Sequence, residues 1–135
     1  MNKVKIVCRA LFVDNKKRIL FVRKEGSDFW SLPGGKLDEE DESLNVSLAR
    51  EIKEELNIDI KIGNIKFIKE LHKNNIRYIE LIWQVSFIDG IIPVKENIYE
   101  LSNHELVDIK WIGYGDLNDN NIKPEFLKEY ILNMN

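Results

Sequence analysis

The sequence predicts an α/β or α+β fold in a single domain that covers residues 1–135. Runs of β-branched and apolar residues, separated by turn residues, lie on both sides of a central helical segment. A short amphipathic segment with a proline near its start closes the chain. Strands that flank one helix and precede another are typical of a domain in which helices pack on a sheet. A chain of 135 residues is long enough to bury a substantial core.

Two strands are expected before the central helix. Residues 4–13 and 18–22 are rich in β-branched and apolar side chains, and turn residues lie between them, so the two strands are expected to form a hairpin. A further short strand over residues 30–32 leads into a proline-glycine-glycine turn signal.

The central helix is expected over residues 43–56. Asp41 or Ser43 could cap its start, and the acidic residues in the preceding loop suit the positive end of the helix dipole. The face that packs on the sheet repeats every four residues and consists of Leu44, Leu48, Ile52 and Leu56.

Two more strands are expected after this helix, over residues 65–71 and 77–88, with a turn between them and a break at Gly63 before them. The second of these strands alternates two sets of side chains, as a strand with two different faces does. A long loop, a strand over residues 107–112 and a terminal helix over residues 124–133 complete the expected fold.

The exposed face of the central helix carries a cluster of glutamates. Glu51 lies three residues before Glu54 and four before Glu55, so the three side chains meet on one side of the helix. Carboxylates at these spacings repel one another, and a helix that is merely solvated more often interleaves lysines; Lys53 does not lie on their ridge. Mg²⁺ prefers hard oxygen ligands, so the pattern indicates a divalent metal site. Arg50 precedes Glu54 by four residues and can hold that carboxylate with its forked donor.

The run from Arg50 to Ile58, REIKEELNI, resembles the sequence box of the Nudix (MutT-like) hydrolases, and so does Glu42, which seven residues separate from Arg50. Six residues separate Gly35 from Glu42 where the family usually has five, and Asn57 stands where the family usually has glycine. The second change is mild, because asparagine tolerates the left-handed conformation that often ends a helix. The resemblance implies an α/β/α sandwich with a central mixed sheet. It also implies an enzyme that hydrolyses a diphosphate linkage in a nucleoside diphosphate derivative.

Metal ligands follow from the resemblance and from the spacing of the carboxylates. The expected ligands of Mg²⁺, or of Mn²⁺ as its substitute, are Glu51, Glu54, Glu55 and a backbone carbonyl at Gly34, with that of Gly35 as the alternative. Arg50 and Glu42 are expected to orient these ligands rather than to bind the metal themselves.

The general base can come from the box or from a later loop among Nudix proteins. The box candidates for catalysis are Glu51 and Glu54. The later candidate is Glu105, whose segment resembles the acidic loop before a tryptophan-bearing strand in MutT-like members; a solvated loop side chain is the competing explanation. Its neighbour His104 could titrate near neutral pH.

Contacts with the substrate are less constrained by the sequence. Arg23 and Gly35 are candidates for binding it, and Arg9 could also reach phosphates, although an exposed arginine is common on any protein surface. Candidates for contact with a base are Phe29, Tyr78, Trp83 and Asn118. Core packing is the competing explanation for Phe29 and for Trp83.

Composition restricts the partners and the compartment. A net charge of −3 and a pI near 5.5 give no overall basic footprint for nucleic acid, so a small-molecule nucleotide is the expected partner. The single cysteine, Cys8, excludes a disulfide framework and is expected to be buried. The first residues are too soon charged for a signal peptide or membrane span, which predicts a cytoplasmic enzyme without membrane contact. A homodimer is a further possibility, because the hairpin over residues 65–88 offers strands for pairing.

Hydrolysis of a nucleoside triphosphate, including a damaged one, to the monophosphate and pyrophosphate is the leading hypothesis, because the chain is short. The alternatives are hydrolysis of ADP-ribose, another sugar nucleotide or a dinucleoside polyphosphate, and a non-catalytic module that binds a nucleotide. ADP-ribose members usually carry a proline after the box, and none lies between Ile58 and Asp89. The intact box carboxylates disfavour the non-catalytic module.

Overall fold

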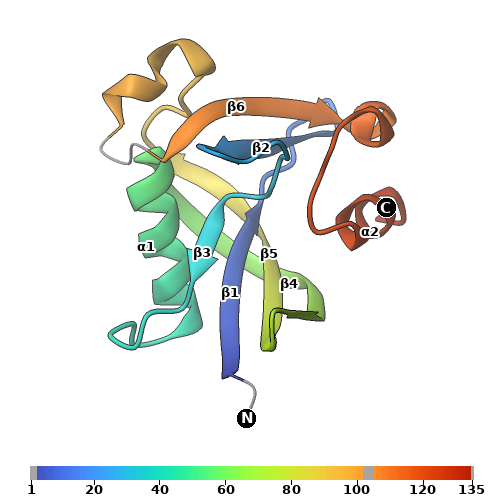
Figure 1. Ribbon diagram of the computed structural model, residues 1–135. Coiled ribbons are helices and arrows are strands. Elements are labelled where there is room, and N and C mark those ends of the chain that lie inside the picture. The colour runs from blue at the N-terminus through green and yellow to red at the C-terminus, as the bar shows by residue number, and fades with distance from the viewer. Residues whose placement is uncertain (1–2, 102–104, 135) are drawn as a thin grey trace.

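The computed structural model describes residues 3–101 and 105–134 (Figure 1). Within these residues the elements are, in chain order, β1 (Lys3–Leu11), β2 (Arg18–Lys24), β3 (Gly34–Lys36), α1 (Leu44–Leu56), β4 (Asp59–Lys73), β5 (Ile76–Asp89), the 3₁₀ helix η1 (Lys95–Glu100), β6 (Leu106–Gly113), the 3₁₀ helix η2 (Tyr114–Asp119) and α2 (Phe126–Leu132).

A mixed sheet with the strand order β3-β1-β5-β4 forms the centre of the molecule. β1 and β5 are parallel, whereas β1–β3 and β4–β5 are antiparallel. β2 pairs with β6 in a second, antiparallel sheet, so the expected hairpin of the first two strands is wrong. An isolated bridge between Val13 and Ile19 joins the chain at that turn. β2 buries side chains on both of its faces, Phe21 on one and Val22 on the other, which requires cover from two directions.

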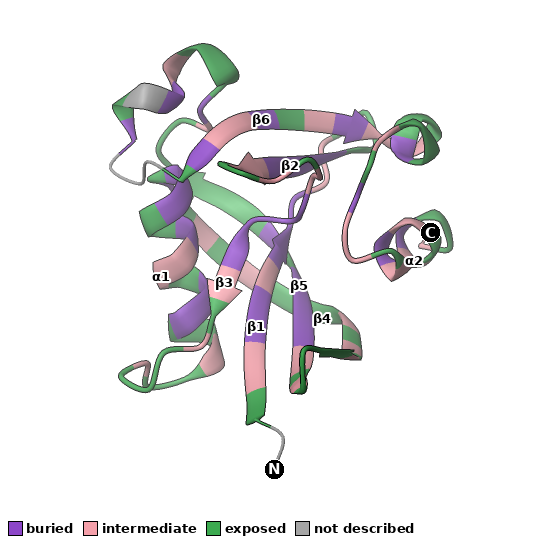
Figure 2. Ribbon diagram, viewed as in Figure 1, coloured by how far each residue is buried: buried purple, intermediate pink, exposed green. Residues whose placement is uncertain are grey.

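Helices cover opposite faces of the central sheet (Figures 1 and 2). Along β5, Leu81 and Trp83 pack in the core that contains α1, whereas Ile82 between them packs in the core that contains α2. This alternation follows from the period of two in a strand, and it confirms the two faces expected for β5. The α/β/α sandwich with a mixed central sheet is therefore confirmed.

The helix α1 has both of its expected ends. The Ser43 hydroxyl accepts a hydrogen bond from the Val46 N–H at 3.1 Å, so Ser43 rather than Asp41 is the N-cap. Asn57 ends the helix in the left-handed conformation, with φ of 56°. Leu48 and Ile52 of α1 are fully buried. Burial of such a side chain stabilises a fold by about 1.5–3 kcal/mol.

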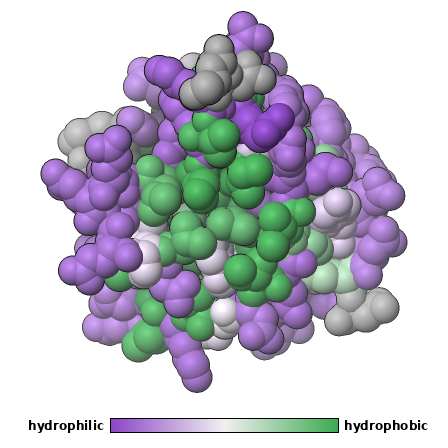
Figure 3. All heavy atoms as spheres, turned by 90° about the horizontal axis from the view of Figure 1, so that it is seen from below, coloured by the Kyte–Doolittle hydropathy of each residue, from purple (hydrophilic) through white to green (hydrophobic). Residues whose placement is uncertain are grey.

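The strand β4 is longer than expected. It begins at Asp59, and Gly63 does not break it but lies in an irregular stretch where the register with β5 shifts. A β-bulge accommodates an extra residue such as Gly63, which has no side chain to pack, and regular strand pairing resumes after the bulge. The isoleucines Ile65 and Ile68 of this strand are 43% and 61% exposed. Figure 3 shows that apolar side chains gather in the middle of the face seen from below, ringed by hydrophilic ones.

The remaining expectations concern smaller features. Cys8 is fully buried, as predicted. The expected long loop after β5 contains the short helix η1, and the terminal helix begins at Phe126. Among the residues that the structure describes, no helix has the length and apolar character to cross a bilayer.

Candidate active site

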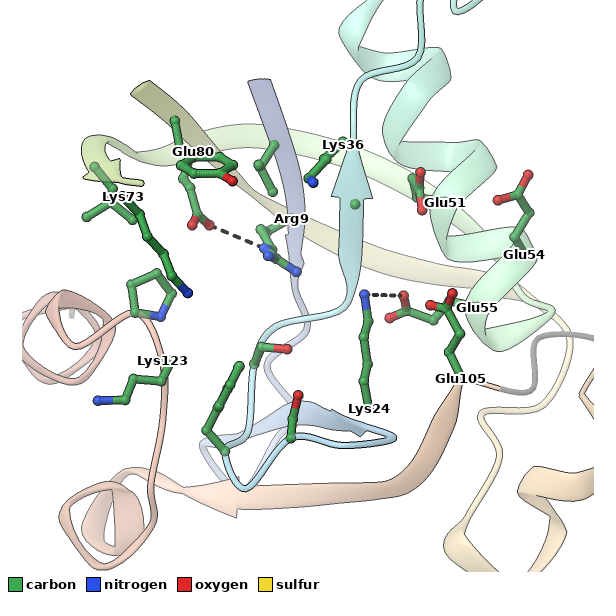
Figure 4. A pocket seen from close by; sticks show the side chains of 18 of the residues that line it. Arg9, Lys24, Lys36, Glu51, Glu54, Glu55, Lys73, Glu80, Glu105 and Lys123 are labelled. Carbon is green, nitrogen blue, oxygen red and sulfur yellow. Dashed lines mark hydrogen bonds and ion pairs between the residues drawn. The ribbon is translucent and has the colours of Figure 1, made fainter. Parts of the chain in front are cut away.

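A cavity of about 950 Å³ opens over β3, β1 and β5, beside α1 (Figure 4). Its acidic lining side chains are Glu51, Glu54, Glu55, Glu80 and Glu105. Its cationic lining side chains are Arg9, Lys24, Lys36, Lys73 and Lys123. The glutamates of α1 lie on one side, and Lys73 and Lys123 lie across the cavity from them.

Two glycines of β3 let the backbone approach α1. A Cβ atom on Gly35 would lie 2.3 Å from Oε2 of Glu51, so a larger residue would displace that carboxylate. Gly34 has a φ of 143°, and a Cβ atom there would lie 2.1 Å from the Cys8 carbonyl oxygen. Gly34 therefore requires glycine for its backbone conformation and its contact with β1, whereas a side chain at Gly35 would only displace the flexible Glu51 carboxylate.

Glu55 is the most deeply buried carboxyl group of the site, with 3% of its side chain exposed. The Gly34 N–H donates to its Oε1 at 3.4 Å, and Lys24 Nζ lies 3.8 Å from its Oε2. Burial raises the pKa of Glu55 to about 7, although the charges of Lys24 and Arg9 oppose that shift. Burial also raises the pKa of Glu51. The nearby positive charges therefore do not fully compensate for the burial of these two carboxyl groups.

Arg50 connects these carboxylates to the acidic loop. It donates to both oxygens of Asp41, from Nε at 2.8 Å and from Nη2 at 2.9 Å. Its Nη1 also lies 3.1 Å from Glu51 and 3.1 Å from Glu54. The two hydrogen bonds from Arg50 hold the pKa of Asp41 well below its usual range. The expected contact between Arg50 and Glu54 is confirmed.

The donor groups fit a divalent metal in type. Hard carboxylate oxygens line one wall, and the buried Glu55 gains most from a nearby positive charge. Within residues 3–101 and 105–134, no three histidine, cysteine or acidic side chains already converge closely enough to hold an ion. In this arrangement Glu51 and Glu54 are held by Arg50, so convergence on a metal requires their side chains to turn.

The family model for the NUDIX domain matches residues 4–130. The chain belongs to this family. Nudix membership is therefore confirmed. The m7GpppN-mRNA hydrolase of Saccharomyces cerevisiae (strain ATCC 204508 / S288c) is 29% identical over 126 residues, which are 92% of this chain but 12% of the yeast protein.

Solved structures share the fold of this chain. The MutT protein from Methanosarcina mazei Go1 has a TM-score of 0.77 and 22% identity, over 97% of this chain and 92% of that one. The E. coli ORF135 protein has a TM-score of 0.76 and 23% identity, over 97% of this chain and 88% of that one. At these identities the likeness shows the fold.

The fold of this Nudix domain brings most of the predicted site residues to one cavity. The lining includes the predicted Glu51, Glu54, Glu55, Glu105 and Gly35, and also Arg9, Phe29 and Tyr78. Gly34 contacts Glu55 through its N–H. Trp83 is 4% exposed and belongs to the core, and His104 lies outside the described residues.

Two predicted site residues do not lie where the sequence suggested. Glu42 is exposed, and Asp41 makes the ion pair with Arg50. Five residues separate Gly35 from Asp41, which is the usual family spacing, so the extra residue of this chain follows the acidic position instead of preceding it. Arg23 does not line the cavity; it donates to the Ser27 carbonyl at 3.3 Å.

Lys24 and Glu80 were not predicted as site residues. Lys24 continues the alternation of Leu20 and Val22, whose side chains pack in the core with α1, so strand periodicity could have placed it near Glu55. Glu80 lies within a predicted strand, but no local pattern indicates what lies opposite a single polar residue.

Proposed function

We propose that this Nudix domain is a metal-dependent pyrophosphohydrolase that cleaves the diphosphate linkage of a nucleoside diphosphate derivative. The proposed substrate is a nucleoside triphosphate, ordinary or damaged, which yields the monophosphate and pyrophosphate. One arrangement supports this function: a single cavity combines the glutamates of α1 with Glu105, and faces them with lysines. The carboxylates suit a metal, and the cations suit the negative charge of a polyphosphate.

We assign metal binding to Glu51, Glu54 and Glu55, with the Gly34 carbonyl as a further ligand. A divalent ion, Mg²⁺ or Mn²⁺, supplies neutralising charge at phosphate oxygens and lowers the pKa of a bound water. Arg50, itself fixed by Asp41, keeps the first two carboxylates beside the cavity. Removal of such a supporting contact typically lowers metal affinity or activity by about 10- to 100-fold.

Proton transfer needs a carboxylate that can reach the attacking water. We assign this general base to Glu105, which lines the cavity beside the start of β6, and keep Glu54 as the alternative. Lys24 lines the same cavity and is placed to donate to phosphate oxygens of the substrate.

Release of phosphate and pyrophosphate tests the proposal directly. Nucleoside triphosphates, ADP-ribose, another sugar nucleotide and a dinucleoside polyphosphate are each incubated with the full chain, with Mg²⁺, with Mn²⁺ and with chelator. We expect turnover that requires the metal and falls by at least about 100-fold in Glu55→Gln and in the general-base variant. Glu105→Gln and Glu54→Gln run side by side to identify that base.

The control is Glu129→Gln, which removes an exposed charge on α2 outside the cavity. Turnover that persists in chelator, or survives in Glu55→Gln, contradicts the metal assignment. Nucleotide binding without any turnover by the wild type favours the non-catalytic module instead.

A linkage between two nucleosides is the second candidate substrate. The yeast relative is named an m7GpppN-mRNA hydrolase, and a cavity of about 950 Å³ lies near the upper end of the usual range for ligand pockets. The dinucleoside polyphosphate in the panel distinguishes this candidate. A homodimer, the absence of nucleic-acid binding and a cytoplasmic location stay predictions from the sequence.

A further inference from the structure

The floor of the cavity contains a buried glutamate outside the Nudix box. Glu80 lies on β5, is 6% exposed and lines the cavity. The parallel register places it beside Val7 of β1, and the antiparallel register places Val7 beside Lys36 of β3. Glu80 is therefore two strands away from β3, roughly 10 Å, while β3 is the strand that Glu51 touches through Gly35.

Only one oxygen of Glu80 is engaged. Arg9 Nε donates to its Oε1 at 3.2 Å (Figure 4). Arg9 Nη1 donates to the Leu32 carbonyl at 3.1 Å, which fixes the guanidinium. Oε2 has no hydrogen-bond donor among the described residues, and it is not sealed away from solvent. A buried carboxylate thus presents a free acceptor to the cavity.

The surroundings of this acceptor suit a flat, partly apolar group. Val7 is 4% exposed and forms the floor beside Glu80. Tyr78 lies two residues earlier on the same face of β5 and lines the cavity, as Phe29 does. An apolar floor with a few fixed polar groups is the usual construction of a small-molecule site.

We propose that Glu80 is a specificity-determining residue that accepts a hydrogen bond from the exocyclic amino group of the substrate's base. This rests on the proposed function, since it places the nucleoside over the floor while the phosphates lie beside α1. Cytosine and adenine present an amino group, whereas uracil and thymine present a carbonyl oxygen at the corresponding position. An ionised carboxylate accepts hydrogen bonds but cannot donate them, so it repels the carbonyl oxygen of uracil or thymine. The site therefore prefers amino-bearing bases, with Arg9 as the positioning residue.

A purely structural pair of Arg9 and Glu80 is the competing explanation, and binding of monophosphates separates the two. Calorimetry measures the dissociation constants of CMP, UMP, AMP and purine ribonucleoside monophosphate, which lacks the amino group of AMP, with Mg²⁺ present. We expect the wild type to bind CMP over UMP, and AMP over its analogue, by at least about tenfold.

Glu80→Gln keeps the shape of the side chain and adds an N–H donor. It should reduce the CMP-to-UMP preference to about one or invert it, whereas Glu129→Gln should keep the wild-type preference. If Glu80→Gln does not fold, Glu80→Asp keeps the carboxylate but withdraws it, and must lower the same preference.

Equal affinity for CMP and UMP in the wild type overturns the assignment, and so does an equal loss for all four ligands in the variant. Pyrophosphate release from CTP and UTP is measured in parallel. Base-dependent binding without turnover keeps the role of Glu80 and removes the proposed hydrolysis, whereas turnover without base dependence does the reverse.

Discussion

Two buried glutamates, Glu55 on α1 and Glu80 on β5, line the same cavity in different surroundings. They are 2% and 6% exposed. Glu80 has a cationic nitrogen of Arg9 at 3.2 Å, whereas the nearest cation to Glu55 is Lys24 at 3.8 Å. The pKa of Glu55 is raised by burial to about 7. These two glutamates show that burial alone does not decide what a carboxyl group can bind. The distance to its cationic partner decides whether it has room for an added cation or only for a neutral hydrogen-bond donor.

The largest expected effect is on stability against pH. The pKa of Glu55 is raised from 4.5 to about 7 in the fold, so the folded state binds more protons than the unfolded state between these values. Ionisation of Glu55 therefore destabilises the folded state. This cost is absent below about pH 4.5, and the free energy of unfolding falls by about 3 kcal/mol in total as the pH rises to about 7 and beyond. Urea unfolding of metal-free wild type and Glu55→Gln at pH 5 and pH 8 measures this. The variant should be more stable than the wild type at pH 8 alone.

Glu80→Gln supplies the opposite sign in the same experiment. It deprives Arg9 of its ion pair, so at pH 8 it should lower the free energy of unfolding, by about 1–3 kcal/mol. Two variants with the same sign at pH 8 would break the distinction between the two glutamates. Mg²⁺ added at pH 8 should stabilise the wild type more than Glu55→Gln, because a ligand stabilises the state that binds it.

A smaller effect is expected where Arg50 anchors the Glu55 side of the cavity. Asp41→Asn weakens the two hydrogen bonds from Arg50 and should reduce kcat/KM by about 10- to 100-fold. Glu42→Gln removes a neighbouring but exposed carboxylate and should change kcat/KM by less than about twofold. Steady-state kinetics of both variants over a range of Mg²⁺ concentrations checks this. A larger loss in Glu42→Gln would restore the assignment made from the family spacing.

The smallest effect concerns the cations of β2. Lys24→Met removes the charge that opposes the raised pKa of Glu55, so the pKa should rise further, with an effect on stability of about 1 kcal/mol or less. Arg23→Met removes a side chain outside the cavity. It should not change the difference in the free energy of unfolding between the wild type and Glu55→Gln. The midpoint of the pH profile of stability measures both, and a shift in Arg23→Met would return that residue to the site.

The local parts of the fold could be predicted from the sequence. Ser43 and Asn57 end α1 through short-range hydrogen bonds and backbone preferences, and the spacing of Glu51, Glu54 and Glu55 fixes them on one side of the helix. The alternation along β5 also indicated correctly which side chains share a face.

Non-local pairing could not be predicted in the same way. The pairing of β2 with β6 joins segments far apart in the chain, and a turn signal beside β2 says nothing about such a partner. The bulge near Gly63 has the same difficulty, because a glycine in a strand pattern is compatible with either a break or a bulge.

The site followed this division. The motif identified the glutamates of α1, but the choice between Asp41 and Glu42 depends on how the acidic loop turns. The contact of Glu80 with Arg9 depends on the register between β1 and β5. Both were beyond local patterns, although the five residues between Gly35 and Asp41 were a usable signal.

The long strand β4 bears on how the protein behaves when concentrated. It is an edge of the central sheet, and such an edge can recruit another chain by backbone hydrogen bonding. Lysines recur along it at Lys61, Lys66, Lys69 and Lys73, and the bulge interrupts its regular pairing groups. Repeated positive charge and an interrupted edge are devices that oppose fibrillar stacking, despite the exposed Ile65 and Ile68. Colloidal solubility is therefore expected to depend on the lysines of one strand more than on the net charge.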